Sequence, residues 1–134
     1  MAVFQLDIVT PEKALYSGSV ERLQAPGSEG SFGVLAGHAP MVASLAVGAL
    51  RFVEESGAIR RLAISGGFVE VQRDRVNVLA ETAEMAEEID VERALAARDR
   101  ARERFEDKGE EMDRARAQAA LARALNRLKV AGPN

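Results

Sequence analysis

The stretch GSEGSFGVLAGHAP, residues 27–40, decides how the rest of the chain is understood. It holds four glycines and a proline, and glycine reaches backbone angles that other residues avoid, so ordered turns are expected here. The apolar residues between the glycines are too many for a free linker: Phe32, Val34 and Leu35. The stretch predicts a tight loop with a short strand, which presents Glu29, Ser31 and His38 at one end of a β-domain.

Short apolar segments on both sides of this loop have the pattern of strands. Phe4, Leu6 and Ile8 alternate with polar residues, which is the period of a half-buried strand. Glycine, proline or charged turn residues, among them Gly18 and Gly66-Gly67, separate the remaining predicted strands, which cover 14–17, 19–25, 41–47, 49–54, 58–65, 68–72 and 75–81. Strands of this length at this spacing predict an antiparallel sandwich or barrel rather than a βαβ fold.

The pattern changes near Glu84, after which alternation disappears. Asp90 is a good N-cap, and the helix that it begins is predicted to end at 107–109. A second helix is predicted from about residue 112 to 130, before Gly132-Pro133. We therefore expect a β-sandwich domain over residues 1–86 and an antiparallel two-helix hairpin over 87–134.

The predicted contact faces of the two helices are mostly alanine. One face of the first helix is predicted to carry Val91, Ala94, Leu95, Ala101 and Phe105, and the second helix has apolar residues at Ala115, Leu121, Ala122, Leu125 and Leu128. At ~25 cal/mol per Å² of buried apolar area, alanine contributes much less than leucine. We expect a weakly held, mobile hairpin with more than one resting place.

Charge and composition exclude several classes of function. The net charge of −3 is too small to argue for a nucleic-acid partner. Residues 1–89 hold 7 Lys+Arg and 12 Asp+Glu, a net of −5, whereas residues 90–134 hold 11 and 9, a net of +2. The chain has no cysteine, which excludes disulfides, thiolate metal sites and cysteine nucleophiles. We expect neither a signal peptide nor a membrane span.

Catalytic motifs are missing from the sequence. His38 is the one histidine, and no HExxH, GxSxG or Walker phosphate loop occurs. Glu54-Glu55 and Glu87-Glu88 have the pattern of solvated edges and of a linker. The sequence therefore predicts neither a catalytic site nor a metal site.

Arginines on the predicted hairpin offer a binding site for an anion. Arg93 and Arg100 are seven residues apart, and Arg123 and Arg127 are four apart, so each pair shares a helix face. Folding of the hairpin could bring the pairs together, and guanidinium groups bind phosphate oxygens well. The alternative is that such arginines pair with acids on their own helix, as Arg100 and Arg104 could with neighbouring carboxylates.

The chain resembles the epsilon subunit of the bacterial-type rotary ATP synthase. The resemblance rests on the glycine-rich stretch at 27–40, on LAISGGFVEVQRDRVNVLAE at 62–81, and on IDVERA at 89–94 with LARALNRLKVA at 121–131. It implies a non-catalytic rotor subunit of the central stalk. It also implies a place on the cytoplasmic face of the bacterial plasma membrane, reached through the complex.

The resemblance also implies partners and sites. The sandwich would bind the gamma subunit and the c-ring, with Glu29, Ser31 and His38 in the contact loop, although Ser31 stands where some relatives carry an acid. The hairpin would fold against the sandwich or extend toward the catalytic alpha/beta head and impede ATP hydrolysis. No cofactor would be required, and a regulatory ATP would be held by the residues that match ATP-binding members: Asp90, Arg93, Arg100, Arg123 and Arg127.

The residues alone leave two other functions possible. A stand-alone nucleotide-sensing module would use the same helical hairpin, and titration with ATP would detect it. A small β-sandwich enzyme ranks last, because the chain offers neither a nucleophile–base pair nor a metal set.

Overall fold

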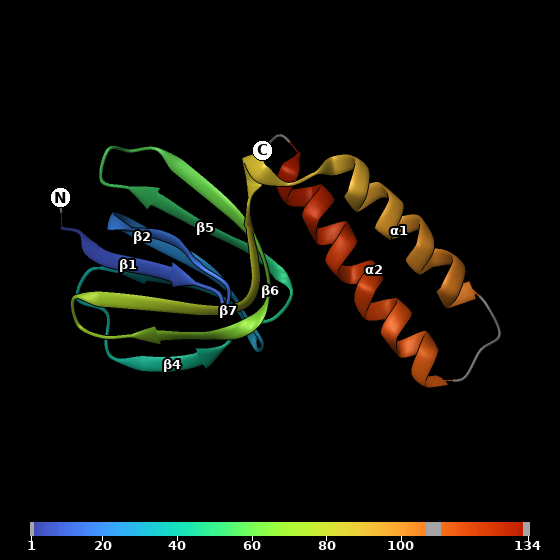
Figure 1. Ribbon diagram of the computed structural model, residues 1–134. Coiled ribbons are helices and arrows are strands. Elements are labelled where there is room, and N and C mark those ends of the chain that lie inside the picture. The colour runs from blue at the N-terminus through green and yellow to red at the C-terminus, as the bar shows by residue number, and fades with distance from the viewer. Residues whose placement is uncertain (1, 107–110, 133–134) are drawn as a thin grey trace. The chain divides into compact units, whose positions relative to one another are not determined.

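The computed structural model describes residues 2–106 and 111–132 (Figure 1). The chain divides into two compact units, Met1–Met85 and Ala86–Asn134, which we call the β-unit and the helical unit. A β-sandwich followed by a helical hairpin is the fold class that the sequence predicted, and it is confirmed.

Seven strands form the β-unit. They are β1 (Phe4–Val9), β2 (Ala14–Gly27), β3 (Gly30–Leu35), β4 (Met41–Ser44), β5 (Gly48–Glu54), β6 (Ile59–Val71) and β7 (Arg75–Met85). The order of hydrogen-bonded strands is β1-β7-β6-β5-β2-β3, while β4 pairs with β6 and β1 also pairs with β2. Because β1 pairs with both β7 and β2, five of the strands close into a ring. All pairings are antiparallel except that of β1 with β7.

The core of the β-unit follows from the period-two pattern of its strands. Phe4, Leu6 and Ile8 of β1 are buried, and the residues between them are half-buried. Strands that face each other supply fully buried aliphatic side chains and one aromatic ring, that of Phe52, whose centroid lies 4.5 Å from that of Tyr16. The core therefore consists of large apolar side chains in contact across the ring.

Two glycines bend β6 rather than end it. β6 pairs with β5 over Ile59–Ile64 and with β4 over Phe68–Val71, so it changes partner between them. Gly66 and Gly67 stand at this change with φ of 73° and 111°, and a Cβ on Gly67 would lie 2.1 Å from the carbonyl oxygen of Leu79. The prediction of a turn between two strands is wrong here, because pairing with β7 continues past the bend.

Gly18 does not divide β2 either, although the sequence predicted a break. Leu6 pairs with Gly18 in the part of the β1–β2 ladder that is regular, from Phe4 to Ile8, and β2 continues to Gly27. The missing side chain leaves room for the Tyr16 ring, since a Cβ on Gly18 would lie 2.8 Å from the Tyr16 hydroxyl. Glycine in this strand therefore serves close packing rather than a turn.

The helical unit contains a 3₁₀ turn, η1 (Ala86–Glu88), and two α-helices, α1 (Val91–Glu106) and α2 (Glu111–Ala131). Asp90 caps α1 as predicted: its Oδ1 accepts a hydrogen bond from the Arg93 amide at 3.1 Å, and its carbonyl accepts one from Ala94 at 3.0 Å. The helices lie side by side (Figure 1). The predicted end of the first helix, residues 107–109, lies outside the described residues.

A row of alanines joins the two helices. Ala94 and Ala101 on α1 are buried, as are Ala117 and Ala124 on α2, with a spacing of seven residues in each helix. We call these four residues the alanine seam. Ile89 and Val130 are also buried.

The apolar residues that the sequence singled out on the second helix lie mostly outside the contact between the helices. Ala115 and Ala122 are exposed, Leu125 is 41% exposed, and Leu121 and Leu128 are half-buried. On the first helix the prediction holds better, since Ala94 and Ala101 are buried, but Val91 is 45% exposed. The smallest side chains form the contact because they let the helix axes come close, and the leucines then flank it.

Among the described residues, no helix is both long and apolar enough to pass through a lipid bilayer.

Candidate functional site

The arginines that the sequence singled out lie beside the alanine seam. Arg93, Arg100 and Arg123 each come directly before a seam alanine, and Arg127 follows one by three residues. Arg93 and Arg100 are exposed, whereas Arg123 and Arg127 are half-buried.

Helical spacing places these arginines on one side of the hairpin. On α1, Arg93, Ala97, Arg100 and Arg104 follow one another at steps of four, three and four. On α2, residues 116, 120, 123 and 127 are Arg, Ala, Arg and Arg, at steps of four, three and four. The structure therefore supplies two facing rows of arginine, with alanines between them.

Part of this side is a groove of about 450 Å³ between the helices. Four alanines and four charged residues line it: Ala97, Arg100, Ala101, Arg104, Asp113, Arg116, Ala117 and Ala120. We call it the arginine groove. Of the predicted ligand residues, only Arg100 belongs to it.

The antiparallel packing explains why the predicted residues divide into two groups. Ala101 and Ala117 line the groove together. In an antiparallel pair, Ala94, seven residues before Ala101, therefore lies level with Ala124, seven residues after Ala117. Arg93 is therefore level with Arg123 and Arg127, whereas Arg100 lies about two turns away, near Arg116.

Asp90, the fifth predicted ligand residue, already has a structural task. Its Oδ1 accepts the Arg93 amide and so completes the first turn of α1. The residue as a whole is exposed.

Sequence reasoning missed Arg104, Asp113 and Arg116 as site residues. It treated Arg104 as a partner for an acid on its own helix, but Asp99 instead accepts a hydrogen bond from its neighbour Arg98, Nε to Oδ1 3.0 Å. The signal was present in the spacing, because Arg104 continues the Arg93–Arg100 row by four residues and Arg116 precedes Arg123 by seven.

The predicted contact loop of the β-unit is split by a strand. Glu29 lies at the exposed tip of the β2–β3 hairpin, between the paired residues Gly27 and Gly30. Ser31 is the second residue of β3, and its hydroxyl oxygen accepts a hydrogen bond from Gln24 Nε2 at 3.2 Å.

His38 lies beyond the other end of β3, where its amide donates to the Leu35 carbonyl oxygen at 3.2 Å. β3 has six residues, and at about 3.3 Å per residue it spans about 20 Å. The expectation that Glu29, Ser31 and His38 share one end of the β-domain is therefore wrong. The reason is that residues between the glycines form an extended strand instead of a closed loop.

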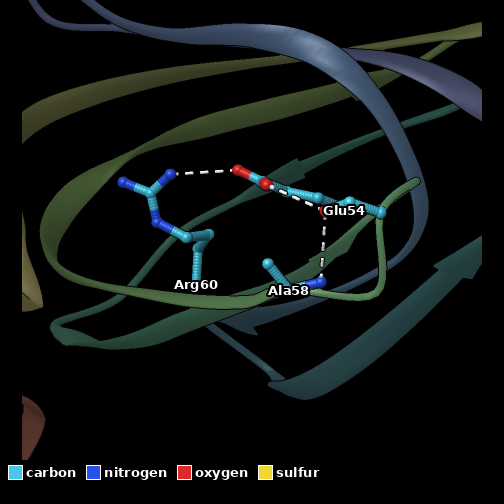
Figure 2. A network of polar contacts seen from close by, with 4 residues as sticks. Glu54, Ala58 and Arg60 are labelled. Carbon is cyan, nitrogen blue, oxygen red and sulfur yellow. Dashed lines mark hydrogen bonds and ion pairs between the residues drawn. The ribbon is translucent and has the colours of Figure 1, made fainter.

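A polar network holds the turn between β5 and β6 (Figure 2). Arg60 Nη1 lies 3.0 Å from Glu54 Oε1, Ser56 Oγ lies 3.5 Å from Glu54 Oε2, and the Glu54 amide donates to the Ala58 carbonyl oxygen at 2.8 Å. The predicted turn at 55–57 is confirmed, but Glu54 is a partner within it rather than only a solvated edge residue. Burial, with a further contribution from Glu54, raises the pKa of Tyr16, while Arg60 acts in the opposite direction.

The described residues contain no group of three or more histidine or carboxylate side chains arranged to hold a metal ion. They also have no buried side-chain nitrogen or oxygen atom without a hydrogen-bond partner.

Residues 3–86 match the family described as "ATP synthase, Delta/Epsilon chain, beta-sandwich domain", and residues 87–132 match "ATP synthase, Delta/Epsilon chain, long alpha-helix domain". The chain belongs to the ATP synthase delta/epsilon chain family. The resemblance seen in the sequence is confirmed.

Relatives in this family are similar over nearly their whole length. The ATP synthase epsilon chain of Desulforamulus reducens is 51% identical over 127 residues, which are 95% of this chain and 96% of the relative. The epsilon chain of Symbiobacterium thermophilum is 47% identical over 133 residues, 98% and 95% of the two chains. The chain is accordingly a non-catalytic, epsilon-type ATP synthase subunit.

Solved structures agree on the fold. A chain of the Euglena gracilis mitochondrial ATP synthase, in a structure of OSCP, F1 and c-ring, gives a TM-score of 0.81 at 31% identity, over 91% of this chain and 77% of that one. A chain from the central stalk and c-ring of the Tetrahymena thermophila enzyme gives 0.62 at 15% identity, over 96% of each chain, which shows likeness of fold alone.

Proposed function

We propose that the chain is a rotor subunit of the central stalk of a proton-translocating ATP synthase, where it couples the gamma subunit to the c-ring. The observation that carries this proposal is the match of both domains, in order, over residues 3–132. The β-unit would supply the rigid attachment, because its core is closed by large buried side chains. The chain would lie on the cytoplasmic face of a bacterial plasma membrane, held there through its partners.

Copurification tests the rotor role. Tagged chain should retain the gamma subunit of its own organism, and a mixture with gamma and c-ring should form one complex in size-exclusion chromatography. A chain that binds neither partner under conditions in which gamma is folded would contradict the proposal.

The contact residues are proposed separately, since the structure separates them. Glu29, at a hairpin tip, would face basic c-ring loops, with Ser31 adding a hydroxyl rather than a second charge. His38 would serve a contact at the other end of β3. Glu29→Gln should weaken c-ring binding and leave gamma binding intact, whereas equal loss of both partners would speak against this division.

We further propose that the helical unit restrains ATP hydrolysis by the catalytic head. The alanine seam supports this, because two helices in contact through methyl groups can separate from their resting place at small cost. The net charge of +2 over residues 90–134 suits docking on an acidic surface of the head.

Hydrolysis by the assembled head tests the regulatory role. Full-length chain should give a lower ATPase rate than a chain ending at Glu87, which keeps the whole β-unit. Equal rates would remove the inhibitory role and leave the rotor role intact.

A second candidate function is ATP sensing by the helical unit. It is favoured by the two arginine rows, which bring Arg93 level with Arg123 and Arg127, with Arg100 further along the same side. Asp90 would contribute its exposed oxygen. Calorimetric titration with Mg²⁺-ATP should give heat that Arg127→Ala abolishes, and no binding at millimolar ATP would exclude this function.

A further inference from the structure

β3 is the last strand in the hydrogen-bonded order of the β-unit, and it has a neighbour on one side only. It pairs with β2 from Gly30 to Leu35. Among the described residues, no strand pairs with its other side, which we call the free edge. An unpaired strand edge exposes a row of amide and carbonyl groups that another strand can use.

The β2–β3 hairpin decides which backbone groups face the free edge. Its two-residue loop makes Gly27 and Gly30 the closing hydrogen-bonded pair. Bonding alternates along an antiparallel pair, so every second residue of β3 after Gly30 also bonds to β2. The residues between them direct their backbone groups to the free edge: Ser31, Gly33 and Leu35.

Pro26 agrees with this assignment. It stands opposite Ser31 in the ladder, at a position where neither residue bonds to the other, and proline has no amide proton to donate there. The Pro26 carbonyl oxygen accepts the Ala46 amide instead, at 2.9 Å. The outward set of β3 therefore follows from the hydrogen bonds around it.

The free edge lacks the features that keep sheet edges apart. From Gly30 to Gly37 the sequence has no charged residue and no proline. The register of β3 with β2 is continuous, without a bulge. Leu35 is 63% exposed at the end of the strand. Such an edge is a template for a further strand.

A hollow of about 360 Å³ lies along this strand, and Ser31, Gly33 and Leu35 belong to its lining. Gly33 leaves much of the space, because a Cβ there would have one neighbour within 4 Å, the Leu23 carbonyl oxygen at 3.7 Å. An apolar side chain that arrives along the free edge therefore finds room beside Gly33.

A second copy of β3 fits the free edge when it runs antiparallel. With Gly33 opposite Gly33 of the other copy, all the outward residues meet outward residues, and each opposed pair can exchange two backbone hydrogen bonds. Leu35 then faces Ser31 of the other copy and lies diagonal to its Gly33. The largest exposed side chain of the edge thus meets the smallest residues of the edge, over the hollow.

Charge favours the antiparallel orientation over the parallel one. Glu29 comes just before β3, and no other charged residue lies between it and the end of the strand. A parallel pair would bring the two Glu29 carboxylates together, and like charges directly opposite are destabilising. The antiparallel pair places them at opposite ends, each at the end where the other copy carries His38.

We propose that the free chain forms a symmetric homodimer through its β3 edges, antiparallel and with Gly33 opposite Gly33. The contact has six residues from each copy, which is smaller than a stable interface needs, so the dimer is weak and reversible. It does not depend on the rotor role. Because the dimer covers Ser31, the two copies must separate before Ser31 can contact another partner.

Sedimentation velocity of the full-length chain tests the association. Between about 5 and 500 µM, the weight-average mass should rise from the monomer value of 14.4 kDa toward twice that value. L35E places a carboxylate in the contact and should weaken the association at least about tenfold. Its circular dichroism spectrum should match that of the wild type, because Leu35 is exposed.

A matched control makes the same substitution at another exposed leucine. Leu79 is 45% exposed, but it lies on β7, which pairs with both β1 and β6. L79E should associate as the wild type does. Equal losses in L35E and L79E would mean nonspecific apolar association, and a loss in L79E alone would place the contact on β7. Either outcome overturns the proposal, as does a chain that stays monomeric at about 500 µM.

Disulfide trapping measures the register independently of stability. The chain has no cysteine, so every disulfide joins introduced residues. G33C should form a covalent dimer under mild oxidation, because opposed residues of a strand pair lie within the span of a disulfide. S31C mixed with L35C should give the heterodimer, whereas each alone should give little, because like residues are about 13 Å apart along the strands.

Mass spectrometry distinguishes the products of the mixture. A preference of S31C for itself would mean a parallel pair, and equal yields from all combinations would mean random collision. Both results overturn the proposal, and so does a G33C variant that forms no covalent dimer.

Discussion

The contact residues of the two units are buried to similar extents, but their side chains differ in size. The β-unit encloses Leu6, Ile8, Leu50, Phe52 and Leu62, each with no exposed surface, whereas the seam of the helical unit consists of alanines. Full burial of a leucine or phenylalanine contributes about 1.5–3 kcal/mol, and a single methyl contributes well under half of that. Equal burial therefore does not mean equal stability, and we expect the helical unit to be the less stable of the two.

The sharpest way to break this comparison is to remove a large core side chain. Phe52→Ala deletes a fully buried ring that packs on Tyr16, and we expect a loss of about 3–5 kcal/mol in the unfolding free energy of the β-unit. Urea denaturation followed by hydrogen exchange at β5 amides measures it. Phe68→Ala is the control, because Phe68 is 53% exposed and should cost far less.

The alanine seam should fail in the opposite way, through excess volume. Ala101→Leu forces a larger side chain between the helices and should destabilise the helical unit by about 1–3 kcal/mol, with no change in the β-unit. The helical circular dichroism signal during thermal unfolding reports it. Ala122→Leu, at an exposed position, should be close to neutral; an equal cost at both sites would mean that the seam is not the contact.

Removing the N-cap of α1 tests whether a stability loss can be confined to the helical unit. Asp90→Ala removes the acceptor of the Arg93 amide, and we expect about 1 kcal/mol of lost stability, confined to the helical unit. Asp90→Asn keeps an acceptor oxygen and should lose less. Thermal unfolding of both variants, monitored at 222 nm, distinguishes the cap from a general effect of lost charge.

The smallest expected effect concerns pH and belongs to the β-unit. Burial raises the pKa of Tyr16 in the folded chain above the ordinary tyrosine value of 10.0, so ionisation favours the unfolded state. Stability should be constant below pH 10 with respect to this group and should fall as pH rises above 10. Tyr16→Phe should flatten that decline; if the slope between pH 9.5 and 11 is unchanged, Tyr16 does not cause it.

Much of the fold could be predicted because local signals agree with it. The alternation in β1, the Asp90 cap and the change of pattern near Glu84 each depend on neighbouring residues alone. The errors lie where distant partners decide. Gly66 and Gly67 have the composition of a turn, yet pairing of β6 with β7 carries the strand through them.

The candidate site was half predictable for a similar reason. Helical spacing placed Arg93, Arg100, Arg123 and Arg127 on suitable faces, but it could not say which residues of α1 lie level with which residues of α2. That depends on the seam, where alanine rather than leucine makes the contact. Arg116 and Asp113 join Arg100 only once this register is known.

The pairing of β1 with β7 imposes an order of assembly on the growing chain. β1 and β2 are neighbours in sequence, so that hairpin can form early, but the other edge of β1 must wait for Arg75–Leu79. Until β7 is synthesised, both β1 and β6 present open edges to other nascent chains. Ring closure by β7 therefore removes the open edges of β1 and β6, and its strand pairings involve no residue of the helical unit.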